Sequence, residues 1–336
     1  MKNMHDNIVE INNLEVEIIS PDGLLKAVRG LSLNVRRGET HGIVGESGCG
    51  KSVMVKSIMR LHDESKVAYS GNIFVNNKNI MDLKIRNMRK LRGKEMAMIF
   101  QNPMTSLSPI MTVGEQILEV LTAKSNISKD EAKKRSLEIL EKVGITPGER
   151  RYKQYPFELS GGLLQRVMIA MSMVNNPELL IADEPTTALD VTIQAQILDL
   201  MKSVQKSTGV SIIFITHDLG VIAEMCDRVS IMYAGKIVES GNILDIFDHP
   251  AHPYTKALFE SKPKGSDRAE RMLTIPGAPP SLYDDIPGCS FALRCKYACP
   301  KCHSTSPKKI ELDKEHWASC HFSREFFEKK ELLHDE

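Results

Sequence analysis

The sequence has almost no excess charge of either sign and no long apolar run. Its 336 residues carry 44 Lys and Arg against 43 Asp and Glu, so no strong overall field draws the chain towards nucleic acid or an anionic membrane. No stretch approaches the roughly 18 apolar residues of a membrane span. The N-terminus, MKNMHDNIVE, mixes charged and apolar residues and has no apolar core like that of a signal peptide. These absences predict a soluble, cytosolic protein that does not bind nucleic acid.

The seven cysteines lie mostly at one end of the chain. Four of the seven cysteines fall within GCSFALRCKYACPKC (288–302), and Cys320 follows eighteen residues after Cys302. Thiols stay reduced in the cytosol, so the cluster indicates metal binding or catalysis before disulfides.

The length predicts two folding units. Composition shifts after about residue 262, where 262–288 is rich in Pro and Gly and shows little periodicity. We therefore expect a main domain over 1–261, and a linker with a small Cys-rich module over 262–336.

Within the main domain, apolar patterning predicts alternating strands and helices. The spans 8–19 and 31–36 alternate like strands on either side of the turn signal SPDG, and 113–175 is mainly helical. A helix is expected to begin near Lys51. Buried strands are predicted at 40–45, 95–100, 179–183 and 211–216, with a helix over 192–207. Strand, helix and strand in this order predict an α/β fold with a parallel sheet.

The octet GESGCGKS fits the phosphate-binding loop pattern G-x-x-x-x-G-K-[ST] and lies between a predicted strand and helix. Its amides would wrap the phosphates, Lys51 would reach the β- and γ-phosphates, and the Ser52 hydroxyl would ligate Mg²⁺. Because such a loop binds through its backbone, a cysteine is tolerated in it, and we expect the Cys49 thiol to be exposed to modification. The predicted nucleotide-binding residues are Gly45, Glu46, Ser47, Gly48, Cys49, Gly50, Lys51 and Ser52.

Two acidic residues, Asp183 and Glu184, lie where the predicted strand LLIAD continues into EPT. A buried carboxylate is costly unless it holds a cation, so Asp183 is predicted to belong to the Mg²⁺ shell. Glu184 comes next and could polarise the water that attacks the γ-phosphorus. The Asp-Glu pair indicates a catalytic role only because a phosphate-binding loop precedes it in the chain.

A second anion site is predicted in LSGGLLQR, where Ser160, Gly161 and Gly162 open a helix. With this motif the chain resembles the ATP-binding subunits of ABC transporters. In that family the motif closes over nucleotide held by the opposite subunit of a head-to-tail dimer, which explains two phosphate-binding helix ends in one chain.

Three further residues match the family pattern in order, and the resemblance covers roughly residues 8–260. Gln101 resembles the loop glutamine that touches Mg²⁺ and the attacking water. Asp190 resembles the loop residue that signals across the dimer, and His217 the histidine that contacts the γ-phosphate. The resemblance implies an ABC-type nucleotide-binding domain with a helical subdomain at about 104–175, using ATP and Mg²⁺. Catalysis would fall to Glu184, His217, Lys51 and Gln101, and Mg²⁺ binding to Ser52, Gln101 and Asp183.

The single cassette and the short stretch between Gln101 and the signature favour a transporter subunit over a soluble ABC ATPase. The stretches FQNPMTSLSPIMTVGEQI (100–117), HPAHPYTKAL (249–258) and IPGAPPSL (275–282) resemble oligopeptide and dipeptide importers, with nickel or another small solute as the alternative cargo. The resemblance implies a peripheral ATPase at the cytoplasmic face of the membrane. Its implied partners are a second, different ATPase subunit, two transmembrane permease subunits and an extracytoplasmic substrate-binding protein.

Three interpretations compete for the cysteines: disulfides, which the cytosol disfavours, a zinc site and an iron–sulfur cluster. A zinc site could use the close pairs around Cys299, with His303 or His321 as further ligands. A [4Fe–4S] cluster needs four thiolates and tolerates irregular spacing. The order Cys289, Cys295, Cys302 and Cys320 resembles the tail of peptide-importer ATPases, some of which carry such a cluster. Iron–sulfur is therefore favoured over zinc and over unligated thiols, with Cys299 as a spare ligand and a structural or regulatory role.

Overall fold

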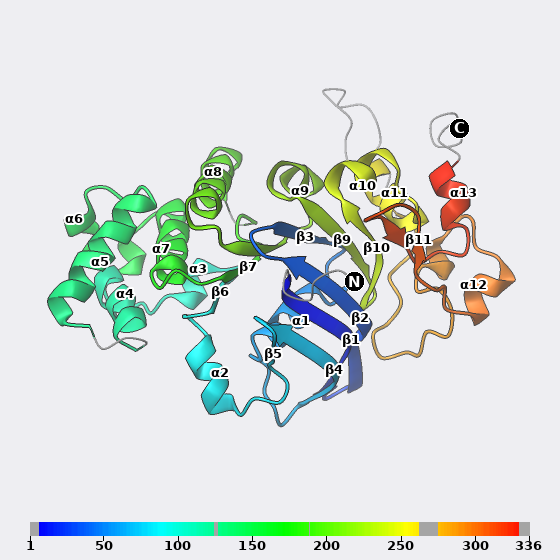
Figure 1. Ribbon diagram of the computed structural model, residues 1–336, viewed down its shortest axis with the longest axis horizontal. Coiled ribbons are helices and arrows are strands. Elements are labelled where there is room, and N and C mark those ends of the chain that lie inside the picture. The colour runs from blue at the N-terminus through cyan, green and yellow to red at the C-terminus, as the bar shows by residue number, and fades with distance from the viewer. Residues whose placement is uncertain (1–6, 124–126, 188, 262–274, 329–336) are drawn as a thin grey trace. The chain divides into compact units, whose positions relative to one another are not determined.

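The computed structural model describes residues 7–123, 127–187, 189–261 and 275–328 (Figure 1). They form two compact units. The first unit comprises the described parts of Met1–Glu10, Asn34–Thr40 and Phe74–Thr216. The second comprises those of Ile11–Leu33, His41–Ile73 and His217–Glu336. Residues 262–274 of the predicted linker lie outside the described residues.

The first unit contains three parallel strands. β6 (Met96–Ile99) pairs with β7 (Leu179–Asp183), which pairs with β8 (Ser211–Ile215). Every residue of β7 and β8 is buried, as expected for central strands of a parallel sheet whose two faces are both covered. The strands predicted from the apolar runs at 95–100, 179–183 and 211–216 are confirmed.

Helices make up most of the rest of the first unit, and α4 packs against α5, α6 and α7 (Figure 1). Local signals set their ends: a capping box between Thr112 and Glu115 begins α4, and Ser128 caps α5. The predicted helical stretch 113–175 is confirmed. The helices of this unit are α2 (Ile85–Leu91), α3 (Pro103–Ser106), α4 (Val113–Thr122), α5 (Lys129–Lys142), α6 (Gly148–Tyr152), the 3₁₀ turn η1 (Pro156–Glu158), α7 (Gly161–Met173) and α8 (Val191–Thr208).

The second unit has a sheet to which the C-terminal segment contributes its own strands. The strand order is β11 (Ile310–Glu311), β12 (Trp317–Ala318), β10 (Lys236–Asn242), β9 (Arg228–Tyr233) and β3 (Thr40–Val44). β3 and β9 are parallel, whereas the other pairs are antiparallel. Because Glu239 and Ser240 of β10 pair with β12, the C-terminal segment extends the edge of this sheet.

The remaining helices of the second unit are α1 (Lys51–Ile58), α9 (Leu219–Met225), α10 (Ile243–Asp248), α11 (Pro253–Glu260), η2 (Ala292–Arg294), α12 (Pro300–Ser304) and α13 (Ser323–Glu328). The helix predicted to begin near Lys51 is confirmed. The described C-terminal residues belong to the same compact unit as α1.

A second sheet has the order β2 (Gly23–Arg36), β1 (Asn7–Ser20), β4 (Val67–Val75) and β5 (Lys78–Asn79). The sequence predicts only residues 31–36 of β2, because apolar and polar residues do not alternate over 23–30. Residues 23–30 are extended in the structure because other segments bind their backbone: the N–H of Lys26 donates to the Leu282 carbonyl at 2.9 Å, and that of Arg29 to Gly235 at 3.0 Å.

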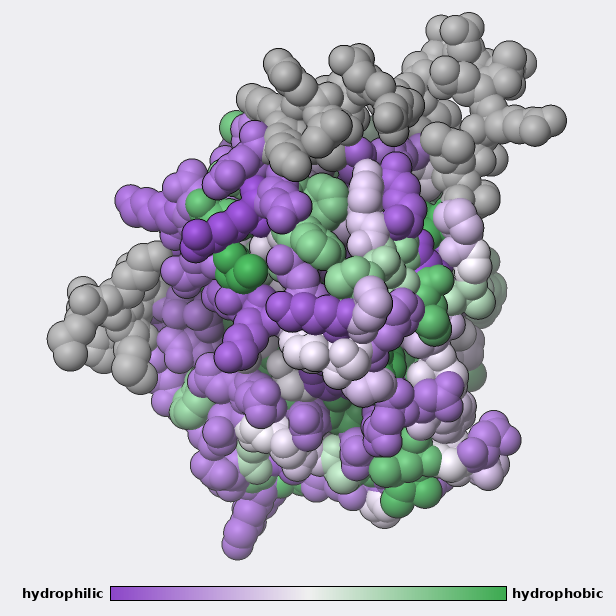
Figure 2. Space-filling view, turned by 90° about the vertical axis from the view of Figure 1, so that its right-hand side faces the viewer, coloured by the Kyte–Doolittle hydropathy of each residue, from purple (hydrophilic) through white to green (hydrophobic). Residues whose placement is uncertain are grey.

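The face of the molecule seen in Figure 2 is mainly hydrophilic, with apolar residues in small, separate patches. Among the residues that the structure describes, no helix combines the length and the apolar character that a membrane crossing requires.

Candidate functional site

The loop Gly45–Ser52 lies in the second unit, between β3 and α1, as predicted. Gly48 and Gly50 have left-handed φ values of 78° and 104°, which glycine adopts without strain. Neighbouring backbone also requires small residues here. A Cβ on Gly45 would lie 2.1 Å from the carbonyl oxygen of Met232, and one on Gly50 would lie 2.4 Å from that of Ala27. The loop therefore lies close against the backbone of β9 and β2.

Two side chains inside the loop are buried. The Lys51 ammonium donates to the carbonyls of Gly45 at 2.7 Å and Glu46 at 2.9 Å. The prediction that the Cys49 thiol is exposed is wrong, since the residue is buried. Burial raises the pKa of Cys49 above that of an ordinary thiol, so the reactive thiolate is disfavoured. The loop turns this side chain inward, which its spacing in sequence could not reveal.

The first unit brings Gln101 and Glu184 together. The Gln101 Nε2 donates to Glu184 Oε2 at 2.9 Å, and the Thr187 hydroxyl donates to the same oxygen at 3.0 Å. Asp183, 4% exposed, immediately precedes Glu184 at the end of β7. Glu184 has φ 49°, a conformation that costs a non-glycine residue roughly 1–3 kcal/mol and is concentrated at functional sites. This fixed carboxylate beside an amide can orient a water molecule.

The glycine-rich signature in the same unit begins α7, as predicted. Ser160 is the N-cap of this 13-residue helix, and Ser160 and Gly161 are exposed. A Cβ on Gly162 would come within 2.7 Å of Ile193, so glycine allows α8 to approach the start of α7. Asp190 caps α8 by accepting a hydrogen bond from the Ile193 N–H at 2.9 Å. The structure thus presents a helix N-terminus suited to an anion.

His217 belongs to the second unit and is exposed at the residue before Asp218, the N-cap of α9. The predicted nucleotide residues are therefore divided: the second unit carries Gly45–Ser52 and His217, and the first carries Gln101, Asp183, Glu184, Asp190 and the signature.

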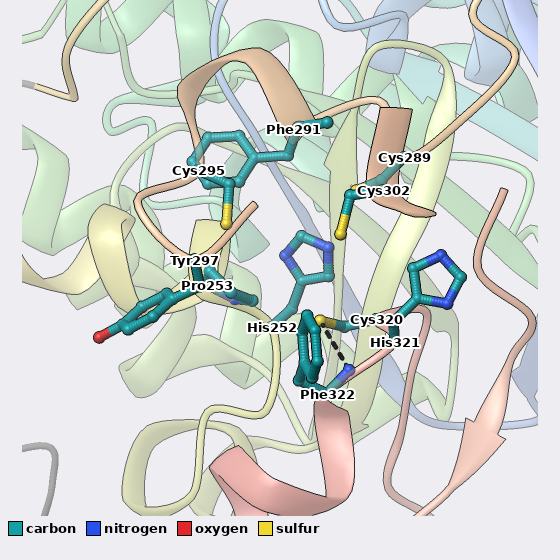
Figure 3. A pocket seen from close by; sticks show the side chains of 11 residues that line it. His252, Pro253, Cys289, Phe291, Cys295, Tyr297, Cys302, Cys320, His321 and Phe322 are labelled. Carbon is teal, nitrogen blue, oxygen red and sulfur yellow. Dashed lines mark hydrogen bonds between the residues drawn. The ribbon is translucent and has the colours of Figure 1, made fainter. Parts of the chain in front are cut away.

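Four of the clustered cysteines line one pocket of the second unit (Figure 3). They are Cys289, Cys295, Cys302 and Cys320. A backbone hydrogen bond of 2.7 Å from the Cys289 N–H to the Cys302 carbonyl joins two of them. Cys299 is not among the lining residues, although its Sγ lies 3.6 Å from that of Cys302. Of the two histidines predicted as possible zinc ligands, His321 lines the pocket and His303 does not.

Burial governs the titration of these thiols. It raises the pKa of Cys289, and it raises that of Cys295 to about 11 and that of Cys320 to about 12. Cys299 is different, because a hydrogen bond from the Cys302 backbone N–H lowers its pKa. In the described part of the chain, no three His, Cys, Asp or Glu side chains are grouped so as to hold one metal ion.

His252 also lines the pocket, and it is 1% exposed. Burial lowers its pKa to about 3, so the ring is neutral at pH 7. Its Nδ1 accepts the Tyr254 N–H at 3.0 Å, which places the ring proton on Nε2. That nitrogen has no hydrogen-bond partner among the described residues. A buried donor without an acceptor is costly. A group bound in this pocket that accepted a hydrogen bond from His252 Nε2–H would remove that cost.

Family models match two parts of the chain. Residues 28–187 match the model described as ABC transporter, and residues 238–302 match that described as oligopeptide/dipeptide transporter, C-terminal region. Over 92% of this chain and 87% of the relative, it is 49% identical to the oligopeptide transport ATP-binding protein OppD of Bacillus subtilis. This chain belongs to the ATP-binding subunits of oligopeptide/dipeptide ABC transporters. It is an ABC transporter ATPase that energises oligopeptide or dipeptide import.

Other comparisons agree. The dipeptide transport ATP-binding protein DppD of Bacillus subtilis is 46% identical over 94% of this chain and 94% of its own length. Among solved structures, the dimeric ATP-binding cassette MJ0796 bound to ADP and Pi is 30% identical, with a TM-score of 0.63 over 70% of this chain and 98% of that chain. The predicted family, α/β cassette fold and ATPase activity are confirmed.

Sequence reasoning missed four residues of this ABC ATPase that the structure places at its candidate sites. Thr187 contacts Glu184, Tyr254 and Arg294 contact Glu46, and His252 enters the cysteine pocket. His252 and Tyr254 lie in the HPAHPYTKAL stretch, which sequence analysis used only as a family likeness. No periodicity or spacing in the sequence marks Thr187 or Arg294. Thr187 contacts Glu184 within a turn, and Arg294 contacts a residue that is far away in the sequence.

Proposed function

We propose that this subunit hydrolyses Mg²⁺-ATP with Glu184 as the base. The observation that carries the proposal is the Gln101–Glu184–Thr187 arrangement, in which both neighbours donate to one carboxylate oxygen. These two donors fix the direction of the carboxylate that would act on water. A positioned base of this kind accelerates proton transfer by about 10²–10⁴-fold.

Other side chains serve the phosphates and the metal. Lys51 and His217 stabilise charge on the γ-phosphate, while Ser52, Gln101 and Asp183 hold Mg²⁺. In the structure Lys51 Nζ is bonded to carbonyls of its own loop, and phosphate oxygens would exchange for these acceptors. The amides of Gly45–Ser52 bind the remaining phosphate oxygens.

The signature residues serve a second subunit. Ser160 and Gly161 form an exposed helix N-terminus, which we assign to nucleotide held by the other ATPase of a dimer, with Asp190 at that contact. This subunit then pairs with a different ATPase subunit on two permease subunits, at the cytoplasmic face of the membrane. An extracytoplasmic binding protein delivers peptide to the permease.

This assembly predicts that ATPase activity depends on protein concentration. Since one chain supplies half of each composite site, dilution to the monomer should abolish nearly all turnover per chain. The measurement is phosphate release over a dilution series of this subunit mixed with its partner ATPase subunit, with light scattering to establish the oligomeric state. Full activity per chain in a proven monomer would rule the composite site out.

The cysteine pocket fits a [4Fe–4S] cluster held by Cys289, Cys295, Cys302 and Cys320. A cluster places each thiolate on a different iron, so its ligands surround a cavity and do not converge on one ion. The unpartnered Nε2–H of His252 is a donor to which cluster or cysteine sulfur would be an acceptor. The raised pKa values of Cys295 and Cys320 mean that loading must release protons. Such a group would cross-link the C-terminal segment.

Metal analysis tests this assignment. Protein purified without oxygen should be brown and contain about four irons per chain. Cys302→Ser is expected to lose most of this iron, because it removes a pocket thiolate. The matched variant Cys299→Ser should keep it, since Cys299 does not line the pocket. A colourless preparation with one zinc per chain and no iron would reject the cluster in favour of a zinc-stapled tail.

We propose that residues 1–261 form the ABC ATPase domain, with a helical subdomain at about 104–175. Residues 262–336 then form the linker and Cys-rich module. The helices α4–α7 support the subdomain. The module boundary is one of composition, since the described C-terminal residues pack in the same compact unit as α1.

A further inference from the structure

The phosphate-binding loop touches the C-terminal segment at one acidic residue. Arg294 Nη1 lies 2.8 Å from Glu46 Oε2, the second residue of the loop. The two residues are 248 positions apart in sequence. The Arg294 side chain is 5% exposed and that of Glu46 is 23% exposed, so the pair is far more shielded from water than a surface salt bridge and interacts correspondingly more strongly.

Arg294 is itself fixed from several sides. Its guanidinium makes four hydrogen bonds, the others reaching the Tyr233 hydroxyl at 3.2 Å and the carbonyls of Pro276 at 2.9 Å and Ile275 at 3.1 Å. Burial by itself would lower the pKa of Arg294, but its bonds to Glu46 and Tyr233 outweigh burial and raise it. The ion pair is therefore charged and has a defined geometry.

Hydrogen bonds also hold the backbone of Glu46. Its N–H donates to the Tyr254 hydroxyl at 3.0 Å, and its carbonyl accepts from Lys51 Nζ at 2.9 Å. The rings of Tyr233, Tyr254 and Phe291 pack together with centroids 4.5–5.3 Å apart. Glu46 is thus the point at which the loop, α11 and the turn η2 meet.

We propose that Arg294 is a positioning residue for the phosphate-binding loop, and that the C-terminal segment sets nucleotide affinity by holding Glu46 in place. Arg294 does not itself touch phosphate in this role. It restricts the loop to the shape in which its amides converge, so that less order must be imposed when nucleotide binds. The inference rests on the proposed nucleotide site and adds a residue from a different part of the chain to it.

The test is a double-mutant cycle on the full chain with Arg294→Met, Glu46→Ala and the double variant. The dissociation constants for ATP and ADP are measured by calorimetry, and the thermal midpoint of each variant reports folding. Either single substitution should weaken nucleotide binding about tenfold. The double variant should be no weaker than the singles, because both remove the same link. Arg294→Lys should recover part of the affinity, since a lysine supplies the charge without the fork of donors.

Arg324→Met is the matched control, because Arg324 is an exposed arginine of α13 in the same segment; it should bind nucleotide like the unmodified chain. In the transporter complex, the KM for ATP should rise in Arg294→Met with little change in kcat. Folded Arg294 and Glu46 variants with unchanged affinity, or strictly additive losses, would overturn the inference. Failure of the unmodified chain to bind nucleotide would instead overturn the proposed site together with it.

Discussion

A Glu184→Gln variant is expected to bind ATP as tightly as the unmodified subunit while hydrolysing it at least about a hundredfold more slowly. The amide keeps the shape of the side chain and an oxygen that can accept from Gln101 and Thr187, as Glu184 Oε2 does. It cannot take a proton from water at neutral pH. Binding and turnover should therefore separate, and this is measured by ATP affinity together with phosphate release in the assembled transporter.

The matched control for this variant is Glu138→Gln, an exposed carboxylate of α5 in the same unit, and it should hydrolyse ATP at the unmodified rate. Turnover near wild type in Glu184→Gln would remove Glu184 from the role of base. A loss of ATP affinity equal to the loss of turnover would assign the residue to binding.

The largest expected effect on stability lies at Glu239, a fully buried carboxylate in β10. It accepts hydrogen bonds from the N–H groups of Ala251 at 2.6 Å and His252 at 2.9 Å, and it contacts His316 Nε2 at 2.7 Å. Glu239→Leu would leave these groups without their acceptor in the interior. We expect the free energy of unfolding to fall by about 3–5 kcal/mol, the usual cost of breaking a buried pair.

Urea unfolding followed by circular dichroism measures this loss. His316→Leu should also destabilise the protein, because it leaves the carboxylate buried without its side-chain partner. Glu311→Gln, an exposed position in β11, is the control and should change stability by less than about 0.5 kcal/mol. If Glu239→Leu unfolds at the same urea concentration as the control, the buried cluster does not hold the C-terminal segment to β10.

The parts of the fold that follow from short-range patterns were predictable. Continuous apolar runs predicted β7 and β8, because strands buried on both faces are apolar throughout. Apolar residues three and four apart predicted the helices of 113–175, because a helix buried on one face repeats its apolar positions at that spacing. The start of β2 was not predictable, since Gly23–Gly30 is extended through backbone bonds to residues such as Leu282, more than 250 positions away. The inward turn of Cys49 likewise depends on the packing of the loop.

The sequence by itself determined the family and the ordered set of candidate nucleotide residues. The loop Gly45–Ser52 and the signature Ser160–Gly162 bind through consecutive amides, so the chemistry is complete within a few residues and can be read from their spacing. Only the tertiary structure decided which cysteines share a pocket, that Arg294 holds Glu46, and that Glu239 and His316 are paired in the interior. These features depend on contacts in the buried interior between side chains that are far apart in sequence. There the packing decides which groups form hydrogen bonds, and such pairs produce no periodic pattern in the sequence.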